Sequence, residues 1–380
     1  MDFELSEEQL DIQKAAREFA QGEFDPDTIL ELDRTGQFPE SMWKKACRLG
    51  FIGIHYPEEF GGQGLGIFEN LLVIEVFCRV DSGIGSALST VDLGSEVILK
   101  FGSYEQKERF LVPLTKGERK LSIAFAESED GNDLSSVSAT AEGTGVEYQI
   151  QGQKKFVPNA PFANGFITLC KEPREGWITL MIEREKEGIE VHPVEKMGLR
   201  MIPFGNVHFN GVLVPYENRV GREGDGLEHV QQCYRVAGLT SCAQALGTAH
   251  GALDRAMQHA KQREQFGRKL SQFQALRHKL ADMSVSIEVV RWLTYKAATE
   301  YDQGKVDPGF LATTQLEAGR RLVGVVDEAV QIFGGYGYMA EQAIEHCFRD
   351  AWAIGADLGT EEEQKDQIAD RLLGLEITKK

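Results

Sequence analysis

The sequence predicts an α+β protein built from three consecutive blocks, helical, then β, then helical. Apolar residues recur at helical spacing before residue 120 and again after residue 226, while short runs of β-forming residues fill the stretch between. At about 150 residues per domain, 380 residues correspond to two or three domains. We therefore expect an N-terminal α domain over 1–120, a middle β domain over 121–225 and a C-terminal α domain over 226–380.

The first block opens with a helix start signal. Ser6 is followed three residues later by Gln9, which is the spacing of a capping box. The segment from Pro57 to Gly66 is too rich in glycine for a regular element, so we expect a loop there and a helix from about Phe68 through Val80. The apolar residues that continue the first helix at helical spacing are Leu10, Ile12, Ala15, Ala16, Phe19 and Ala20.

The middle block alternates short apolar runs with glycine and charge. Such runs are typical of strands, and they lie at residues 148–152, 166–169, 177–182 and 206–209. After Gly226 the helical period returns and continues through two further segments to about Ile332. The first of these helices is indicated by Ala243, Leu246, Ala249, Ala252, Leu253, Ala256 and Ala260.

Composition and charge exclude several classes of protein. The apolar share of 42% and charged share of 26% are ordinary for a globular protein, and the net charge of −18 opposes binding to nucleic acid. No apolar run approaches the roughly 20 residues that span a bilayer, and no leader is evident. The six scattered cysteines form no CxxC pair and the histidines form no HExxH set, so we expect reduced thiols, no metal, no membrane partner and a cytoplasmic location.

Two motifs in the last block carry chemical information. In Arg263–Gly267, followed by Gln274, a cation, an aromatic ring and an amide surround a glycine turn, which suits a dinucleotide, although the motif alone favours a solvated helix end capped by glycine. In Gln331–Tyr338 the glycines allow close backbone approach to a ligand or subunit, or simply end a helix.

Two further motifs flank the middle block and close the chain. The polar turn Ala126–Asp133 follows the apolar strand that begins at Ile123, and Lys154–Asn159 comes some 20 residues later. Near the end, Arg349–Ala351 precedes Leu358–Thr360. Each motif is modest alone, but their order and spacing together are distinctive.

With these motifs the chain resembles the acyl-CoA dehydrogenase family from end to end. The resemblance also rests on the N-terminal helix and on Pro57–Leu65, Phe101–Ser103 with Gln106 and Lys107, Gly198–Arg200 and Val214–Pro215. It implies an N-terminal helical domain, a middle β-barrel-like domain and a C-terminal four-helix bundle that enclose FAD. It further implies an acyl-CoA substrate, a homotetramer, and an electron-transferring flavoprotein as partner.

The resemblance also implies particular contacts. Phe156 stands where the family usually has tryptophan, so an aromatic wall beside the flavin is retained, whereas Ala126 and Pro158 stand where threonines are common. The implied FAD contacts are Ile123, Phe125, Ala126, Gly131, Asn132, Phe156, Pro158, Arg263, Phe266, Gln274, Gln331, Gly334, Gly335, Thr360 and Glu362. The implied substrate contacts are Asn132, Tyr234, Arg235, Leu358 and Gly359.

The usual general base of the family is absent. Its glutamate stands immediately before the Gly-Thr of the last motif, which is Leu358 here, and the alternative position before the arginine of the C-terminal domain is Tyr234. Leucine has no proton chemistry, and a phenol with an ordinary pKa of about 10 is a poor base at neutral pH. The backbone N–H of Leu358 remains and is expected to polarise the thioester carbonyl.

Three hypotheses account for the missing base. In the first, Asp92 is the base, because the family's helix around Val91–Ser95 lines the acyl pocket and apolar surroundings raise a carboxyl pKa; otherwise Asp92 is a helix N-cap. In the second, the base is Asp357, one residue before Leu358. In the third, the protein is catalytically silent and only binds FAD and CoA.

A relocated base implies a relocated proton. If the substrate is already α,β-unsaturated, the thioester acidifies the vinylogous γ-hydrogen, and its removal with hydride loss gives a conjugated diene. In this the chain resembles the alicyclic branch of the family, the cyclohex-1-ene-1-carboxyl-CoA dehydrogenases of anaerobic aromatic and alicyclic acid metabolism. Cyclohexanecarboxyl-CoA, or another short-chain acyl-CoA, is the alternative substrate.

Overall fold

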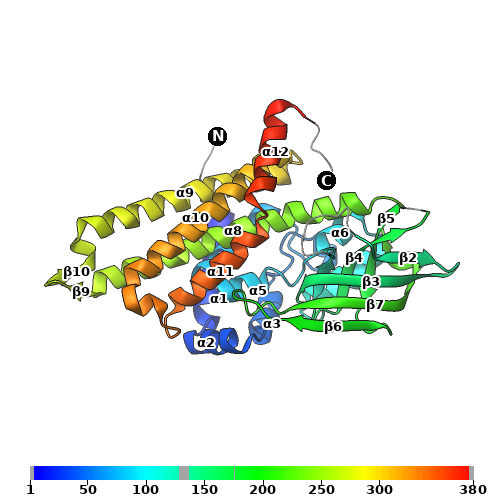
Figure 1. Ribbon diagram of the computed structural model, residues 1–380, viewed down its shortest axis with the longest axis horizontal. Coiled ribbons are helices and arrows are strands. Elements are labelled where there is room, and N and C mark those ends of the chain that lie inside the picture. Colours follow the sequence, from blue (N-terminus) through cyan, green and yellow to red (C-terminus); the bar gives the residue numbers. More distant parts are fainter. Residues whose placement is uncertain (1–3, 128–136, 175, 376–380) are drawn as a thin grey trace.

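The computed structural model describes residues 4–127, 137–174 and 176–375 and arranges them as a helical, a β and a helical block (Figure 1). The expected capping box is confirmed, because Ser6 Oγ accepts from the Gln9 N–H and Gln9 Oε1 accepts from the Ser6 N–H. The predicted loop contains only a short 3-10 turn, η1 (Glu58–Phe60). The helices of the first block are α1 (Glu7–Glu23), α2 (Pro26–Thr35), α3 (Glu40–Arg48), α4 (Ile67–Val80), α5 (Ser82–Leu88), α6 (Ser95–Phe101) and α7 (Tyr104–Thr115).

The middle block is one eight-stranded sheet. Its strands run in the order β6-β7-β3-β2-β4-β5-β8, and β1 pairs in parallel with β4 off this path. Its inner face has its own core around Phe166 and Phe209. The strands are β1 (Leu121–Ala124), β2 (Thr140–Gly143), β3 (Glu147–Pro158), β4 (Gly165–Glu172), β5 (Gly176–Glu183), β6 (Ile189–Val194), β7 (Phe204–Pro215) and β8 (Arg219–Val220).

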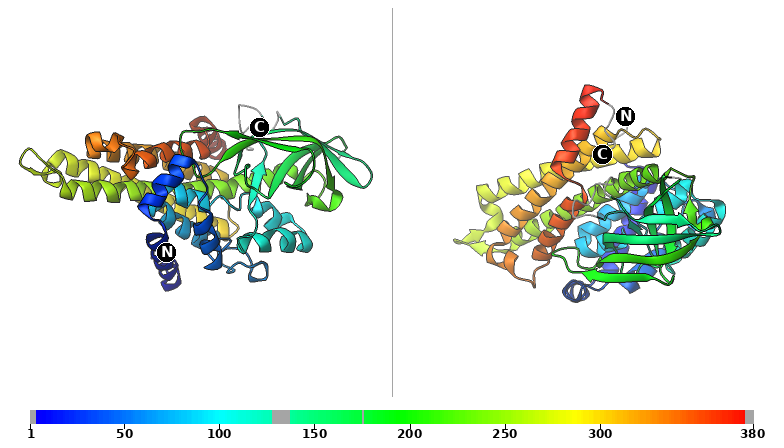
Figure 2. Two further views of the ribbon diagram at one scale, coloured as in Figure 1. Left: turned by 90° about the horizontal axis from the view of Figure 1, so that it is seen from below. Right: turned by 45° about the vertical axis from the view of Figure 1, so that its right-hand side comes forward.

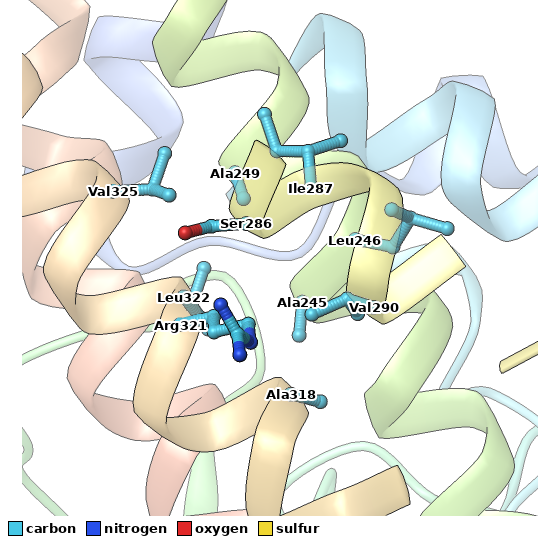
Figure 3. A pocket seen from close by; sticks show the side chains of 10 residues that line it. All are labelled: Ala245, Leu246, Ala249, Ser286, Ile287, Val290, Ala318, Arg321, Leu322 and Val325. Atoms are coloured by element: carbon cyan, nitrogen blue, oxygen red, sulfur yellow. The ribbon is translucent and has the colours of Figure 1, made fainter. Parts of the chain in front are cut away.

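The last block is a bundle of long helices, with the hairpin β9–β10 at one end and α12 projecting from it (Figure 1 and Figure 2). A packing gap too small for a water molecule lies between α8, α9 and α10, lined by aliphatic side chains with Ser286 and Arg321 (Figure 3). Its elements are α8 (Gly226–Gln262), β9 (Glu264–Gln265), β10 (Arg268–Lys269), α9 (Gln274–Asp302), α10 (Pro308–Phe333), η5 (Gly334–Tyr338), α11 (Ala343–Asp357) and α12 (Glu361–Leu373). In the described part of the chain, the helices are all too short or too polar to cross a membrane.

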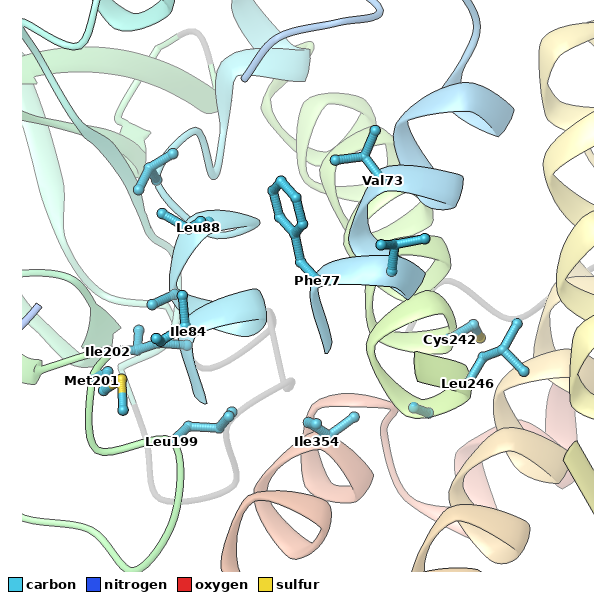
Figure 4. Packing of buried hydrophobic residues seen from close by; sticks show 14 of the residues in the cluster. Val73, Phe77, Ile84, Leu88, Leu199, Met201, Ile202, Cys242, Leu246 and Ile354 are labelled. Carbon is cyan, nitrogen blue, oxygen red and sulfur yellow. The ribbon is translucent and has the colours of Figure 1, made fainter. Parts of the chain in front are cut away.

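The three blocks share one apolar core. Phe77 from α4 and Leu88 from α5 lie in the same cluster as Met201, from the loop before β7, and as Leu246 and Ile354 from the bundle (Figure 4). All five side chains are buried. This shared core fixes the positions of the blocks relative to one another.

A buried charge cluster also joins the blocks. His346 on α11 lies 3.1 Å from Asp33 of α2 through Nδ1, and its Nε2 lies 3.2 Å from Asp350 and 3.4 Å from Asp81. Asp350 also accepts from the Leu199 N–H of the middle block at 2.5 Å. Burial alone lowers the pKa of His346, but the charges of Asp350 and Asp81 outweigh it and raise that pKa well above its usual value.

Candidate active site

Asp92 lies in a break between two helices rather than on a helix. The helix expected around Val91–Ser95 is wrong, because α5 ends at Leu88 and α6 begins at Ser95. The segment 89–94 runs beside β1 instead: the Leu121 N–H donates to the Val91 carbonyl at 2.9 Å, and Asp92 forms an isolated parallel bridge with Leu121. Gly94, at φ +91°, turns the chain into α6.

The Asp92 carboxylate is held by a side chain and does not cap a helix. The N-cap of α6 is Gly94, whereas Asp92 Oδ2 accepts a hydrogen bond of 3.0 Å from the Tyr56 hydroxyl. Burial raises the pKa of Asp92, and Glu96 adds to the rise, while the charge of His55 and the bond from Tyr56 oppose it. The pKa of Asp92 is therefore above its ordinary value, as a general base requires.

Asp92 borders a small cavity of about 20 Å³ with room for about one water molecule, and most of the side chains that line it are apolar. Apart from Asp92, its polar side chains are Asn70 and Ser89, so Asp92 is the one ionisable group among the residues that line it. The apolar part of the wall comes from Phe51, Ile52, Gly53, Val73, Ile74, Phe77 and Leu88.

Tyr234 lies on α8, near the segment 89–94 that carries Asp92. The Cys233 thiol next to it lies near the Gly94 backbone, and the Tyr234 ring lies 6.0 Å from that of Phe125. Burial raises the pKa of the Tyr234 phenol further above its usual value. The phenol is consequently protonated at neutral pH and is no base there.

Leu358 ends α11 close to the same part of α8. Its side chain is only 2% exposed, and its carbonyl accepts from Gln364 Nε2 at 2.7 Å. Gln315, which lies against Gly238 of α8, also donates to this carbonyl at 3.4 Å. The Leu358 N–H, which was expected to face a thioester, donates to the Ile354 carbonyl at 3.3 Å. This long hydrogen bond has to open before the N–H can polarise a ligand.

Asp357, the alternative base, has a different environment. Asp357 is exposed at the C-terminal end of α11, where the charge of Lys196 favours its ionised form. Lys196 precedes the loop that reaches Asp350, so Asp357 faces the charge cluster around His346 rather than the groups around Asp92.

The predicted flavin wall lies at one edge of the sheet. Between Lys154 and Val157 the register of β3 against β7 shifts, and there Phe156 adopts a left-handed φ of +53° and leaves its ring 44% exposed. The Ala126 carbonyl accepts from the Lys155 N–H at 2.8 Å, which brings the end of β1 next to Phe156. Ile123 and Phe125 precede Ala126, and the Pro158 carbonyl accepts from the Ser122 hydroxyl; Gly131 and Asn132 lie outside the described residues.

The second set of predicted flavin contacts lies far from this edge. Arg263 comes 29 residues after Tyr234 along α8, and a rise of about 1.5 Å per residue separates the two by about 40 Å. Its guanidinium lies 5.3 Å from the Tyr336 ring, beside two exposed glycines of η5. The exposed members of this set at the same end of the bundle are Phe266, Gln274, Gln331, Gly334 and Gly335.

The remaining predicted residues lie on α8 and at the start of α12. Arg235 is partly buried next to Tyr234. Thr360 is the N-cap of α12, with Glu363 as its reciprocal partner, and Gly359 turns the chain into it at φ +86°. Glu362 is exposed in the first turn of that helix, where a negative charge is favoured by the helix dipole.

Sequence reasoning missed the residues that surround Asp92. Tyr56 lies 36 positions before Asp92, and His55 pairs with Glu96 at 2.5 Å across 41 positions. The adjacent His-Tyr before the glycine-rich loop was the available signal, but spacing alone does not say where a loop side chain points.

Comparison with known proteins identifies the class that this fold and site define. Family models for the N-terminal, middle and C-terminal domains of acyl-CoA dehydrogenases match residues 6–118, 122–212 and 224–373. The protein is thus a flavin-dependent oxidoreductase of acyl thioesters. The chain belongs to the acyl-CoA dehydrogenase family, with FAD as cofactor.

Individual relatives cover nearly the whole chain. The short-chain specific acyl-CoA dehydrogenase of Clostridium acetobutylicum is 35% identical over 98% of this chain and 100% of its own. The caffeyl-CoA reductase-Etf complex subunit CarC of Acetobacterium woodii is 32% identical over 97% and 99%. Among solved structures, the FAD complex of PigA has a TM-score of 0.92 at 29% identity, covering 99% of this chain and 100% of that one.

The sheet edge fits a flavin. A planar ring system needs a flat apolar wall, and Phe156 presents a large exposed ring from a backbone conformation that costs a non-glycine residue about 1–3 kcal/mol. Strain of this kind is retained where it aims a side chain at a ligand. Ala126 and Pro158 carry no side-chain hydroxyl, so only backbone groups or water could meet the polar edge of a bound ring there.

Proposed function

We propose that the protein is an acyl-CoA dehydrogenase of alicyclic substrates, which converts cyclohex-1-ene-1-carboxyl-CoA to the cyclic diene with Asp92 as the base. The observation that carries the proposal is a carboxylate of raised pKa on the wall of an apolar space. The two positions where the family usually has its base hold Leu358 and Tyr234 and supply none.

In this reaction the substrate loses a proton and a hydride. Asp92 takes the γ-proton that the unsaturated thioester has acidified, and its pKa, raised by burial, makes it a stronger proton acceptor than an exposed aspartate. FAD, when bound, accepts the hydride. The apolar walls contributed by α4 and α5 exclude water from the reacting carbon.

We further propose the remaining contacts by family resemblance. FAD lies along Ile123–Ala126 and Phe156–Pro158, with Gly131, Asn132, Thr360 and Glu362 near its phosphates. Asn132 and Arg235 face CoA, and Tyr234, Leu358 and Gly359 line the thioester. Domain boundaries near residues 120 and 225 fit the start of β1 and of α8.

The distance of about 40 Å along α8 supports a shared flavin. Arg263, Phe266, Gln274, Gln331, Gly334 and Gly335 are then contacts to the flavin of a second copy, and we propose a homotetramer. We propose an electron-transferring flavoprotein as electron acceptor, since the relative from Acetobacterium woodii is a subunit of such a complex. An Arg263→Glu variant should lose FAD on gel filtration if the flavin is shared, and should retain it if each chain binds FAD alone.

A second candidate is an α,β-dehydrogenase of cyclohexanecarboxyl-CoA or of a linear short-chain acyl-CoA. The relative from Clostridium acetobutylicum is named for short-chain substrates, which favours this candidate. In this reaction Asp92 removes the α-proton instead.

The test is anaerobic bleaching of the bound flavin by acyl-CoA thioesters. Cyclohex-1-ene-1-carboxyl-CoA should bleach wild type and leave Asp92→Asn oxidised, whereas Asp357→Asn should bleach as wild type does. Bleaching by linear thioesters alone would support the second candidate. Bleaching of Asp92→Asn within a few-fold of wild type would exclude Asp92 as base, and no bleaching by any of these thioesters would favour a silent FAD- and CoA-binding protein.

A further inference from the structure

The hydrogen bond from Tyr56 to Asp92 belongs to a directed chain. The Tyr56 hydroxyl is buried and lies 3.0 Å from Asp92 Oδ2 and 2.6 Å from Ser95 Oγ. A phenol has one proton to donate, so when it donates to the carboxylate the Ser95 hydroxyl must donate to the phenol oxygen. The order Ser95, Tyr56, Asp92 polarises each bond toward the carboxylate.

We infer that Tyr56 is a positioning residue for the proposed base, which it orients through Oδ2 so that Oδ1 is left for the substrate proton. The inference rests on the proposed role of Asp92. An aspartate side chain rotates about two bonds, and 89–94 lacks the helical backbone that would otherwise restrict it. A fixed acceptor atom is what proton transfer from carbon needs.

Other charged groups besides Tyr56 also act on the pKa of Asp92. His55 and Glu96 form an ion pair of 2.5 Å, and their side chains are only 5% and 11% exposed. The charge of Asp302 on α9 also raises the pKa of His55. Glu96 raises the pKa of Asp92 while His55 lowers it, so these two neighbours act in opposite directions. The neutral thiols of Cys47 on α3 and Cys233 on α8 complete the surroundings.

Removing the phenol proton donor should therefore raise the pKa of Asp92 further. A hydrogen bond to a charged group is lost without replacement in Tyr56→Phe, which keeps the ring and its packing. We expect the rate of flavin bleaching at pH 7 to fall about tenfold, with little change in the half-saturating substrate concentration. The acid limb of the pH–rate profile should move to higher pH by about one unit.

The experiment uses the FAD-loaded enzyme and stopped-flow bleaching by the best thioester between pH 5 and 9. Ser95→Ala should shift the acid limb of the pH–rate profile in the same direction but by a smaller amount. Only the hydrogen bond between Ser95 and Tyr56 is lost in this variant, and the bond from Tyr56 to Asp92 remains. Tyr295→Phe is the matched control, because Tyr295 donates to another buried carboxylate, Glu75, at 2.7 Å on the far side of α4. It should lower thermal stability without moving the limb.

The outcomes separate this inference from the function on which it rests. An unchanged pH profile in Tyr56→Phe, with Asp92→Asn inactive, would overturn the positioning role and leave the base in place. An active Asp92→Asn would overturn the base itself. A shift in Tyr56→Phe and Ser95→Ala, but not in Tyr295→Phe, is the result expected.

Discussion

At the scale of the residue, the site depends on side chains whose backbone geometry the sequence does not show. An aromatic residue at Phe156 was predictable from the motif, but its left-handed φ was not, because the bulge arises from the register between β3 and β7. In the same way, Asp92 was predictable as a candidate carboxylate once the usual glutamate was seen to be absent. Tyr56 was not, since it reaches Asp92 only through the packing of a loop.

Phe156→Gly should separate strain from cofactor binding. Glycine adopts a φ of +53° freely, which relieves about 1–3 kcal/mol, but it adds about 0.5–1 kcal/mol of chain entropy to the unfolded state. The apoprotein should therefore be as stable as wild type or more so in urea, while the Kd for FAD rises about tenfold through loss of the aromatic wall. Phe156→Trp, the matched control, should retain FAD. A large loss of apoprotein stability in the glycine variant would contradict this account.

At the scale of the element, local signals predicted two helices of the first block, the three long helices of the last block and several strands. The Ser6 capping box and the helix after the glycine-rich loop follow from short-range chemistry. The break at 89–94 does not, because it is imposed by pairing with β1, and β1 comes almost 30 residues later. Long-range pairing of this kind leaves little trace in local periodicity.

Gly94→Ala should disturb this break. Gly94 has φ +91°, and an added Cβ would lie 2.8 Å from Ile167 Cγ1 and 3.0 Å from Ile123 Cγ2. We expect a loss of about 2–4 kcal/mol in unfolding free energy and a lower bleaching rate, because the segment that carries Asp92 must move. Gly145→Ala is the control, with φ +99° and nothing within 4 Å of the added atom, so it should lose only the strain contribution and keep full activity. Equal losses in both variants would mean that crowding at Gly94 is unimportant.

At the scale of the whole molecule, the order of the blocks was predictable and their connections were not. The charge cluster of His346 draws one aspartate from α2, one from the start of α5 and one from α11. Of these residues only Asp350 belongs to a motif named in the sequence analysis, Arg349–Ala351, and that motif gave no indication of a buried charge cluster. Similarly, the motifs at Arg263 and Gln331 were evident in the sequence, but their distance from Phe156 follows only from the length of α8.

His346→Gln should destabilise the protein in a way that depends on pH. Removing the cation leaves the buried carboxylates of Asp81 and Asp350 without this ion pair, while Asp33 keeps Arg349, at a cost of about 3–5 kcal/mol. Because the folded-state pKa of His346 is raised, its contribution is fully present below about pH 6.5 and is lost as the pH rises through the folded value. Urea unfolding at pH 6, 8 and 9.5 should show the gap between wild type and variant narrowing as pH rises. The exposed His278→Gln should show no such gap, and a gap that widens with pH would refute the cationic state.

The bridge between Asp92 and Leu121 gives the proposed base and the flavin wall a common frame. From Val91 the backbone bonds run to Leu121, along β1 to Ala126, and across to Lys155 beside Phe156. A base at the usual position, after α11, would instead be attached to the helical bundle. As the proposed base, Asp92 is tied by backbone hydrogen bonds to the same strand as the proposed flavin wall, so a shift of β1 moves both together.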